Sequence, residues 1–173
     1  MKITRKGFGQ VEPNHLSAQR NGQIYAQLPL DSSITTLENG RFMKYNYAGG
    51  KVSTTGDGEF MLVFNEVKVY DERETYKDFA MIKDNYVGGE IYPRLFKTNI
   101  GDIYTTNCIG VANTSKTAEV TYDTDLAVGN KLIVDTSTGY LIKSDSDASM
   151  IWQIVKICDM PDGQAAVKIQ RIK

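Results

Sequence analysis

The clearest alternation of apolar and polar positions lies in the last third of the chain. The stretch 150–158 is the most apolar of the sequence, and a Met-Pro-Asp-Gly turn at 160–163 separates it from a return segment at 165–171. Apolar residues there alternate with the others, which is typical of a half-buried antiparallel strand. The inward side chains are predicted to be Ala165, Val167 and Ile169. This third of the chain is predicted to hold strands at 131–134, 140–142, 150–158 and 165–171.

Two patterns in the first half also predict strands. Residues 60–64 form a nearly continuous apolar run, as expected of a strand whose two faces are both covered. Asn39-Gly40 lies between the strand-like runs 34–37 and 41–47, and Asn-Gly in this context favours a hairpin. We therefore predict a buried strand at 60–64 and a hairpin around Asn39.

One stretch, residues 72–82, could form a helix. Asp71 could cap it, with Glu74 three residues later as in a capping box. Tyr76, Phe79 and Ala80 would then form one apolar stripe. An extended charged loop is the alternative.

The N-terminal segment, residues 1–22, has no regular pattern. Glycine, asparagine and proline interrupt it, and its few apolar residues are scattered. Four basic residues against one acidic residue give it a net charge of +3, whereas residues 99–150 carry seven acids and three lysines. A segment with so few apolar residues cannot bury much of itself, so it is either disordered or extended on another surface. We interpret residues 1–22 as an extended interaction arm.

Composition supports an all-β, mainly antiparallel fold. Ten tyrosines and 15 glycines favour strands and turns over helices. The prediction is a β-barrel or sandwich with the extended N-terminal arm and at most one short helix. Residues 23–173 would form the β domain, either as one body or as two lobes meeting near residues 97–100.

Candidate catalytic and metal-ligating residues are sparse. His15 is the only histidine, and His15-x-Ser17 does not make a catalytic triad. Cys108 and Cys158 are far apart in sequence and lie in apolar, strand-like runs, so we expect buried free thiols and no zinc site. A disulfide between them is the alternative. We predict no enzymatic activity, no cofactor and no metal. Three acidic pairs are interpreted as solvated turns, namely Asp57/Glu59, Asp123/Asp125 and Asp145/Asp147.

Charge and hydropathy exclude two classes of partner. The net charge of −1 predicts no general affinity for nucleic acid or for anionic membranes. The first residues lack the apolar region of a signal peptide, and no apolar run is long enough to span a bilayer.

Four stretches stand out as a set, namely residues 6–20, 76–79, 92–102 and 160–164. Together they resemble small structural proteins of tailed bacteriophages that are encoded among the head genes. The resemblance extends over nearly the whole chain, although its motifs have no catalytic meaning. It implies a virion component made in the host cytoplasm, and first among such components an auxiliary capsid or decoration (cement) protein. Its partners would be the major capsid protein and neighbouring copies of itself, as a homo-oligomer on the capsid.

On this interpretation the N-terminal arm would strap the subunit onto its neighbours. Phe8, Val11 and Leu16 would anchor in apolar grooves, because buried apolar anchors dominate interface energetics. His15 would hydrogen-bond, and Arg20 would meet acidic or carbonyl groups.

Two other interpretations of the sequence remain open. One is another virion part, such as a head-fibre base, a head–tail connector piece or a shell subunit. The other is a carbohydrate-binding module for host attachment, which would use exposed aromatic side chains. The tyrosines available for such a face are Tyr45, Tyr47, Tyr86, Tyr92, Tyr104, Tyr122 and Tyr140.

Overall fold

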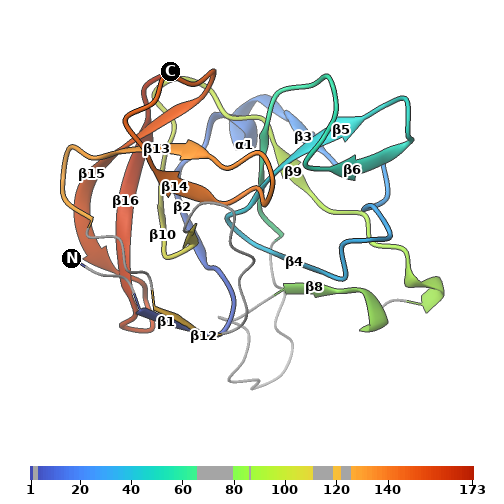
Figure 1. Cartoon of the computed structure of the whole chain (residues 1–173), viewed down its shortest axis with the longest axis horizontal. Coiled ribbons are helices and arrows are strands. Elements are labelled where there is room, and N and C mark those ends of the chain that lie inside the picture. Colours follow the sequence, from blue (N-terminus) through green and yellow to red (C-terminus); the bar gives the residue numbers. More distant parts are fainter. Residues whose placement is uncertain (2–3, 66–79, 86, 111–118, 122–125) are drawn as a thin grey trace.

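The fold is a β-sandwich, seen here in a computed structural model (Figure 1). The structure describes residues 1–173 except 2–3, 66–79, 86, 111–118 and 122–125. Strands dominate, their pairing is mostly antiparallel, and a seven-stranded and a five-stranded sheet form the two main layers. The predicted all-β class is confirmed. Of its two forms the sandwich applies, since no sheet in the described part of the chain closes into a barrel.

The larger sheet contains the four strands predicted in the last third of the chain. Only its first pair of neighbours runs parallel. Its final strand comes from the N-terminal segment, more than a hundred residues away from most of the others. In spatial order the strands are β11 (Ile109–Gly110), β14 (Leu141–Lys143), β13 (Lys131–Val134), β15 (Ile151–Asp159), β16 (Ala165–Arg171), β10 (Ile103–Thr106) and β2 (Val11–His15).

The hairpin of β15 and β16 contains a β-bulge. Ile154 lies opposite Ile169 and Lys156 lies opposite Lys168, so Val155 is an extra residue on β15. A bulge shifts the alternation of side chains by one position. The next side chain after Ile154 to pack on the core is accordingly Ile157.

Burial along β16 agrees with the predicted alternation at its central positions. Val167 and Ile169 are fully buried, as predicted, and Ala165 is half-buried. Ala166 was expected on the outer face, but it is also fully buried, opposite Cys158 of β15.

The smaller sheet is buried on both faces. Along its strands, side chains that pack against the larger sheet alternate with side chains of a second apolar cluster behind it. Leu62 faces the larger sheet, for example, whereas Met61 and Val63 belong to the second cluster. The prediction of a doubly covered strand at 60–64 is confirmed. The sheet contains, in order, β3 (Ile24–Tyr25), β9 (Leu95–Phe96), β7 (Met61–Val63), β5 (Phe42–Asn46) and β6 (Lys51–Ser53).

The main core lies between the two sheets. Trp152 of β15 is fully buried, and its ring centroid is 5.0 Å from that of Tyr104 and 5.9 Å from that of Phe42. Phe42 belongs to the smaller sheet, so this aromatic cluster joins the two layers. Residues on both sides of positions 97–100 therefore share one core.

The predicted hairpin at Asn39-Gly40 is wrong. The chain does turn there, but β4 (Thr36–Glu38) pairs with β8 (Ala80–Ile82), whereas β5 pairs with β6 and β7. The side chain of Asn39 is buried and accepts a hydrogen bond from the Asn65 backbone N–H at 2.8 Å. It also donates to the Asn65 carbonyl at 3.2 Å. Asn39 thus ties the turn to the segment after β7, and the chain passes from one sheet to another.

Helical structure is limited. The described residues contain one α-helix, α1 (Ser17–Asn21), which ends at Gly22 in the left-handed conformation. Short 3₁₀ turns cover Lys83–Asn85 and Val87–Gly89. Most of the helix considered for residues 72–82 lies outside the described residues, and its last three positions form strand β8.

The N-terminal segment folds against its own chain. β1 (Thr4–Lys6) pairs with β12 (Glu119–Thr121), and β2 pairs with β10 at the edge of the larger sheet. Val11, Leu16 and Ala18 lie in the main core. This differs from the expected separate arm, because three spaced apolar side chains and the free edge of β10 are enough to fix an extended segment there.

Candidate functional site

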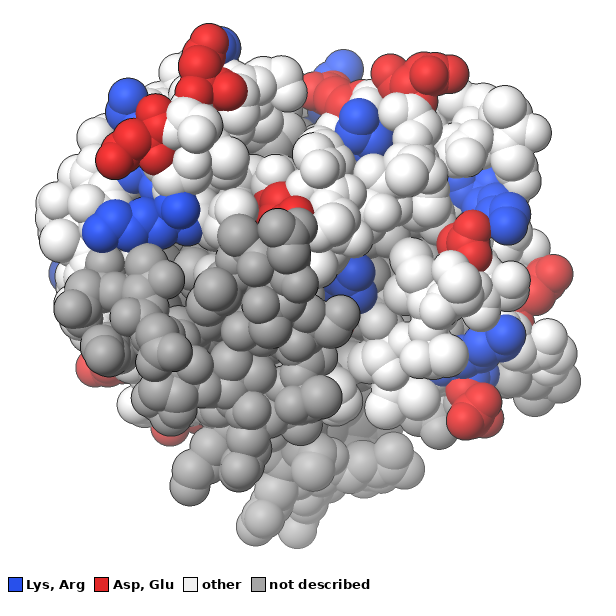
Figure 2. All heavy atoms as spheres, viewed as in Figure 1, with Lys and Arg blue, Asp and Glu red and all other residues white. Residues whose placement is uncertain are grey.

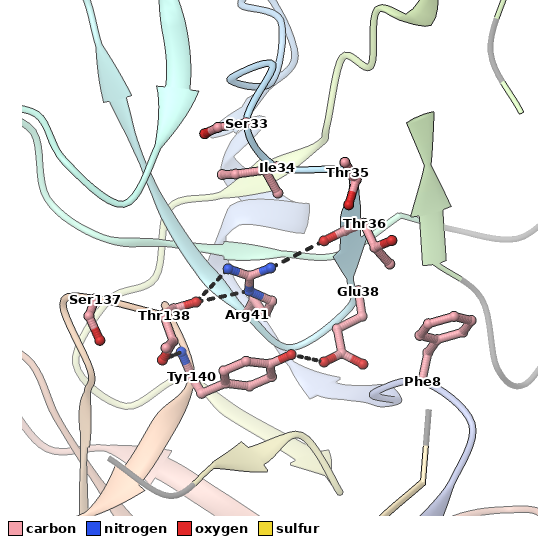
Figure 3. A pocket seen from close by; sticks show the side chains of 10 residues that line it. All are labelled: Phe8, Ser33, Ile34, Thr35, Thr36, Glu38, Arg41, Ser137, Thr138 and Tyr140. Carbon is pink, nitrogen blue, oxygen red and sulfur yellow. Dashed lines mark hydrogen bonds between the residues drawn. The ribbon is translucent and has the colours of Figure 1, made fainter. Parts of the chain in front are cut away.

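A pocket of about 340 Å³ opens where the N-terminal segment, the β4 region and the turn before β14 meet (Figure 3). Most of its wall is polar, with two aromatic rings and one aliphatic side chain. The lining residues are Phe8, Ser33, Ile34, Thr35, Thr36, Glu38, Arg41, Ser137, Thr138 and Tyr140.

A buried carboxylate and a buried phenol form one side of the pocket. Glu38 and Tyr140 are each only 4% exposed. The Tyr140 hydroxyl donates a hydrogen bond to Glu38 Oε1, and the Gly9 backbone N–H donates to Glu38 Oε2 at 2.5 Å. This carboxylate therefore joins three segments that are distant in sequence.

The environment keeps Tyr140 protonated. Burial raises the pKa of its phenol well above the ordinary value, and the neighbouring Cys108 and Glu38 raise it further. A phenol held in its neutral form remains a hydrogen-bond donor. Tyr140 consequently supports the Glu38 carboxylate and is not poised to act as a base.

Arg41 provides the fixed positive charge of the pocket. Its Nε and Nη2 donate to the Thr138 carbonyl at 3.0 and 2.5 Å, and Nη1 donates to the Thr36 carbonyl at 3.2 Å. The guanidinium carbon lies 5.1 Å from the ring centroid of Tyr140. No acidic side chain among the described residues forms an ion pair with it. Carbonyls and a ring thus orient the charge, and no described carboxylate lies within ion-pair distance of it.

Two aspartates hold the loops that bear the hydroxyls of the pocket. Asp31 accepts from the N–H and hydroxyl of Ser33 and pairs with Lys51 at 3.0 Å. These hydrogen bonds, with Ser33 contributing most, lower the pKa of Asp31 to about 2. Asp135 plays the same part in the other loop, accepting from the hydroxyls of Ser137 and Thr138.

The arrangement is suited to binding a polar ligand. A guanidinium with N–H groups left over, hydroxyl groups and aromatic rings recognise oxygen-rich molecules. No group of three or more histidine, cysteine or acidic side chains in the part of the chain that the structure describes could hold a metal ion.

The five predicted interface residues are placed in three different environments. Phe8 is half-buried and lines the pocket. Val11 and Leu16 are buried in the core of their own chain, so they are not free to anchor in a partner as predicted. His15 and Arg20 are exposed, at the end of β2 and on α1. The structure therefore brings only Phe8 to the pocket.

The sequence pattern gives no signal for the residues that build the pocket. Glu38 has the sequence context of a hairpin turn, and Tyr140 is one strand tyrosine among several. The two are 102 positions apart, and no local pattern connects them. The buried carboxylate becomes visible only once β4 and β14 are placed together.

The other candidates from the sequence are the acidic pairs and the two cysteines. Glu59 pairs with Lys97 at 3.0 Å and Asp147 with Lys173 at 2.5 Å, while Asp123 and Asp125 are outside the described residues. Cys108 and Cys158 are both free thiols, as predicted, although Cys158 is only half-buried.

The tyrosines proposed for a sugar-binding face are mostly buried. Tyr45, Tyr104 and Tyr140 have 0–4% exposure, whereas Tyr47 and Tyr92 are exposed. Tyr86 and Tyr122 are outside the described residues. A continuous aromatic face is not formed by the described part of this set.

A second, shallower hollow of about 260 Å³ lies over the outer face of the larger sheet, next to its β2 edge. Glu12 and Asn14 of β2 line it together with Lys156 of β15 and Lys168 of β16. The Thr105 hydroxyl donates to the Asn14 side-chain oxygen at 2.7 Å, which fixes β2 at its edge. The described surface in Figure 2 shows basic and acidic side chains interspersed.

Comparisons with known proteins add no relative, since no protein-family model, curated protein or solved structure matches the chain. Within the described residues, no helix has the length and apolar character needed to cross a membrane.

Proposed function

We propose that the protein is a structural subunit of a tailed-phage virion that binds and stabilises the capsid shell as a decoration protein. The proposal starts from the resemblance of residues 6–20, 76–79, 92–102 and 160–164 to small head proteins of such phages. Its partners would be the major capsid protein and neighbouring copies of the chain.

The observation that carries the proposal is the display of the N-terminal segment at a sheet edge. β2 is the last strand of the larger sheet, and no strand among the described residues pairs with its outer edge. Val11 and Leu16 hold the segment in the core, while Glu12, Asn14 and His15 are exposed. Arg20 follows on α1, and its guanidinium makes no hydrogen bond or ion pair within the described residues.

This edge suits recognition by side chains better than addition of a strand. Pro13 lies in the middle of β2 and has no N–H to donate, and the pairing with β10 is irregular beside it. Proline and charged residues at an edge discourage uncontrolled strand pairing between copies. A partner would therefore contact the exposed side chains of the segment, with His15 and Arg20 as its central contacts.

Many weak contacts can suffice on a capsid. Copies that bind neighbouring positions of a repeating lattice gain from effective concentration, so each contact can be modest. A rigid edge also loses less conformational entropy on binding than a free arm would.

Co-sedimentation with undecorated capsids of the phage that encodes the chain tests the proposal. The wild-type protein is expected to bind saturably and stoichiometrically. His15→Ala together with Arg20→Ala should weaken binding at least tenfold, because both side chains are exposed and leave the core intact. Lys131→Ala is the matched control, an exposed cation four strands away from β2 in the same sheet. Absence of capsid binding by the folded wild-type protein would refute the proposed function.

A further inference from the structure

The pocket that Arg41 lines has the properties of a ligand site. It is distinct from the β2 edge proposed above for capsid binding. Three of the five guanidinium N–H groups donate to the carbonyls of Thr138 and Thr36. These bonds fix the orientation of the planar group, and two N–H groups remain. Because no described acidic residue pairs with Arg41, a ligand carboxylate can supply the missing negative charge.

Hydroxyl groups beside Arg41 are available as well. The hydroxyls of Ser33, Ser137 and Thr138 are taken up by Asp31 and Asp135. Thr35 and Thr36 also line the pocket, and their hydroxyls have no partner among the described residues. These two positions can therefore exchange hydrogen bonds with hydroxyl groups of a ligand.

The apolar part of the wall favours a compact ring. Phe8 stands at the side of the pocket beyond Glu38 in Figure 3, and Ile34 lies on the side of the threonines. A volume of about 340 Å³ accommodates a molecule of monosaccharide size. The C–H face of a sugar can pack on an aromatic ring while its polar groups reach the opposite wall.

Hydrogen bonds from its own chain reduce the repulsion that the Glu38 carboxylate would exert on an anion in the pocket. Each of its oxygens already accepts a hydrogen bond, one from the Tyr140 hydroxyl and one from the Gly9 N–H. Figure 3 shows the carboxylate turned toward the Tyr140 hydroxyl.

We propose that this pocket binds an acidic monosaccharide of the uronic acid class. The carboxylate lies on Arg41, ring hydroxyls bond to Thr35 and Thr36, and the apolar face of the ring packs on Phe8. The inference goes beyond capsid binding and does not depend on it.

Calorimetric titration of the full chain with three probes tests the inference. Glucuronate carries both a carboxylate and ring hydroxyls. Glucose lacks the carboxylate, and acetate lacks the hydroxyls. Glucuronate is expected to bind at least tenfold more tightly than either of the others. Equal binding of acetate would show a general anion site, and equal binding of glucose would show that Arg41 does not select a carboxylate. Either result, or no binding of glucuronate, would overturn the proposal.

Variants then locate the site. Arg41→Gln should reduce glucuronate affinity at least tenfold, since the charge-assisted contact with the ligand carboxylate is lost. Because Arg41 also holds two loops, Thr35→Val provides a second variant that removes one exposed hydroxyl with little change in shape, and a loss of a few fold is expected. Lys131→Gln is the control cation outside the pocket and should bind as the wild type does. If Thr35→Val and a folded Arg41→Gln both retain wild-type affinity, the ligand is bound elsewhere and the assignment is wrong.

Discussion

The hydroxyl of Tyr140 donates to the Glu38 carboxylate in a place from which water is largely excluded. Removing a donor from a buried charged acceptor costs more than removing one from an exposed acceptor, because water cannot replace it. Tyr140→Phe is therefore expected to lower the free energy of unfolding by about 1–3 kcal/mol. Urea denaturation followed by Trp152 fluorescence measures the change.

Tyr47→Phe is the matched control at the residue scale. Tyr47 is 73% exposed, so loss of its hydroxyl should change stability by less than about 0.5 kcal/mol. Equal effects of the two substitutions would mean that the contact between Tyr140 and Glu38 contributes nothing to stability.

Individual residue roles were the hardest feature to predict from the sequence. The alternation of apolar residues places Val167 and Ile169 inward because it depends only on neighbouring positions. The roles of Glu38 and Arg41 depend on the positions of Tyr140 and Thr138, about a hundred residues away. The residues next to a polar side chain in sequence do not predict which distant group it will contact.

At the scale of elements, one glycine connects the two main sheets. Gly139 precedes β14, and its carbonyl accepts from the Phe42 N–H of β5 at 2.7 Å. Its φ is +77°, and an added Cβ would lie 2.4 Å from the Phe42 carbonyl oxygen. The tight backbone contact between the layers therefore requires a residue without a side chain.

Comparison with a second glycine separates steric contact from backbone strain. Gly129 also has a positive φ, +90°, but no atom lies within 4 Å of the position that an added Cβ would occupy there. Gly129→Ala is expected to cost about 1–2 kcal/mol through strain alone. Gly139→Ala should cost about 1–3 kcal/mol more, because the methyl group must displace backbone. Thermal and urea unfolding measure both, and equal costs would contradict the close contact between the sheets.

Strands were predicted better than their pairing. The strands at 60–64 and in the last third can be recognised from the arrangement of apolar residues within their own sequence. Asn39-Gly40 has the composition of a hairpin turn, yet the buried bonds between Asn39 and Asn65 direct the chain into another sheet. Such long-range contacts decide which strands pair, and a turn motif alone does not predict them.

At the scale of the whole molecule, the N-terminal segment belongs to the folded body. Leu16 is 2% exposed and lies in the core cluster that contains Trp152 and Phe42, one from each main sheet. The sequence could not predict this, since the segment shows no periodicity and its anchors fit positions supplied by residues far along the chain. Loss of Leu16 packing should therefore weaken the whole domain and not only its first 22 residues.

Leu16→Ala is expected to lower the free energy of unfolding by about 2–5 kcal/mol, the range for truncating a buried leucine. Trp152, the only tryptophan, reports on the shared core, so its fluorescence should change in the same single transition as far-ultraviolet circular dichroism. Arg20→Ala is the control on α1 and should alter stability by less than about 0.5 kcal/mol, because the side chain is exposed. An unchanged urea midpoint for Leu16→Ala would mean that residues 1–22 do not contribute to the core. In that case the segment would be free to act as a strap, and the contacts of a capsid partner would have to be sought at Val11 and Leu16 as well as at His15 and Arg20.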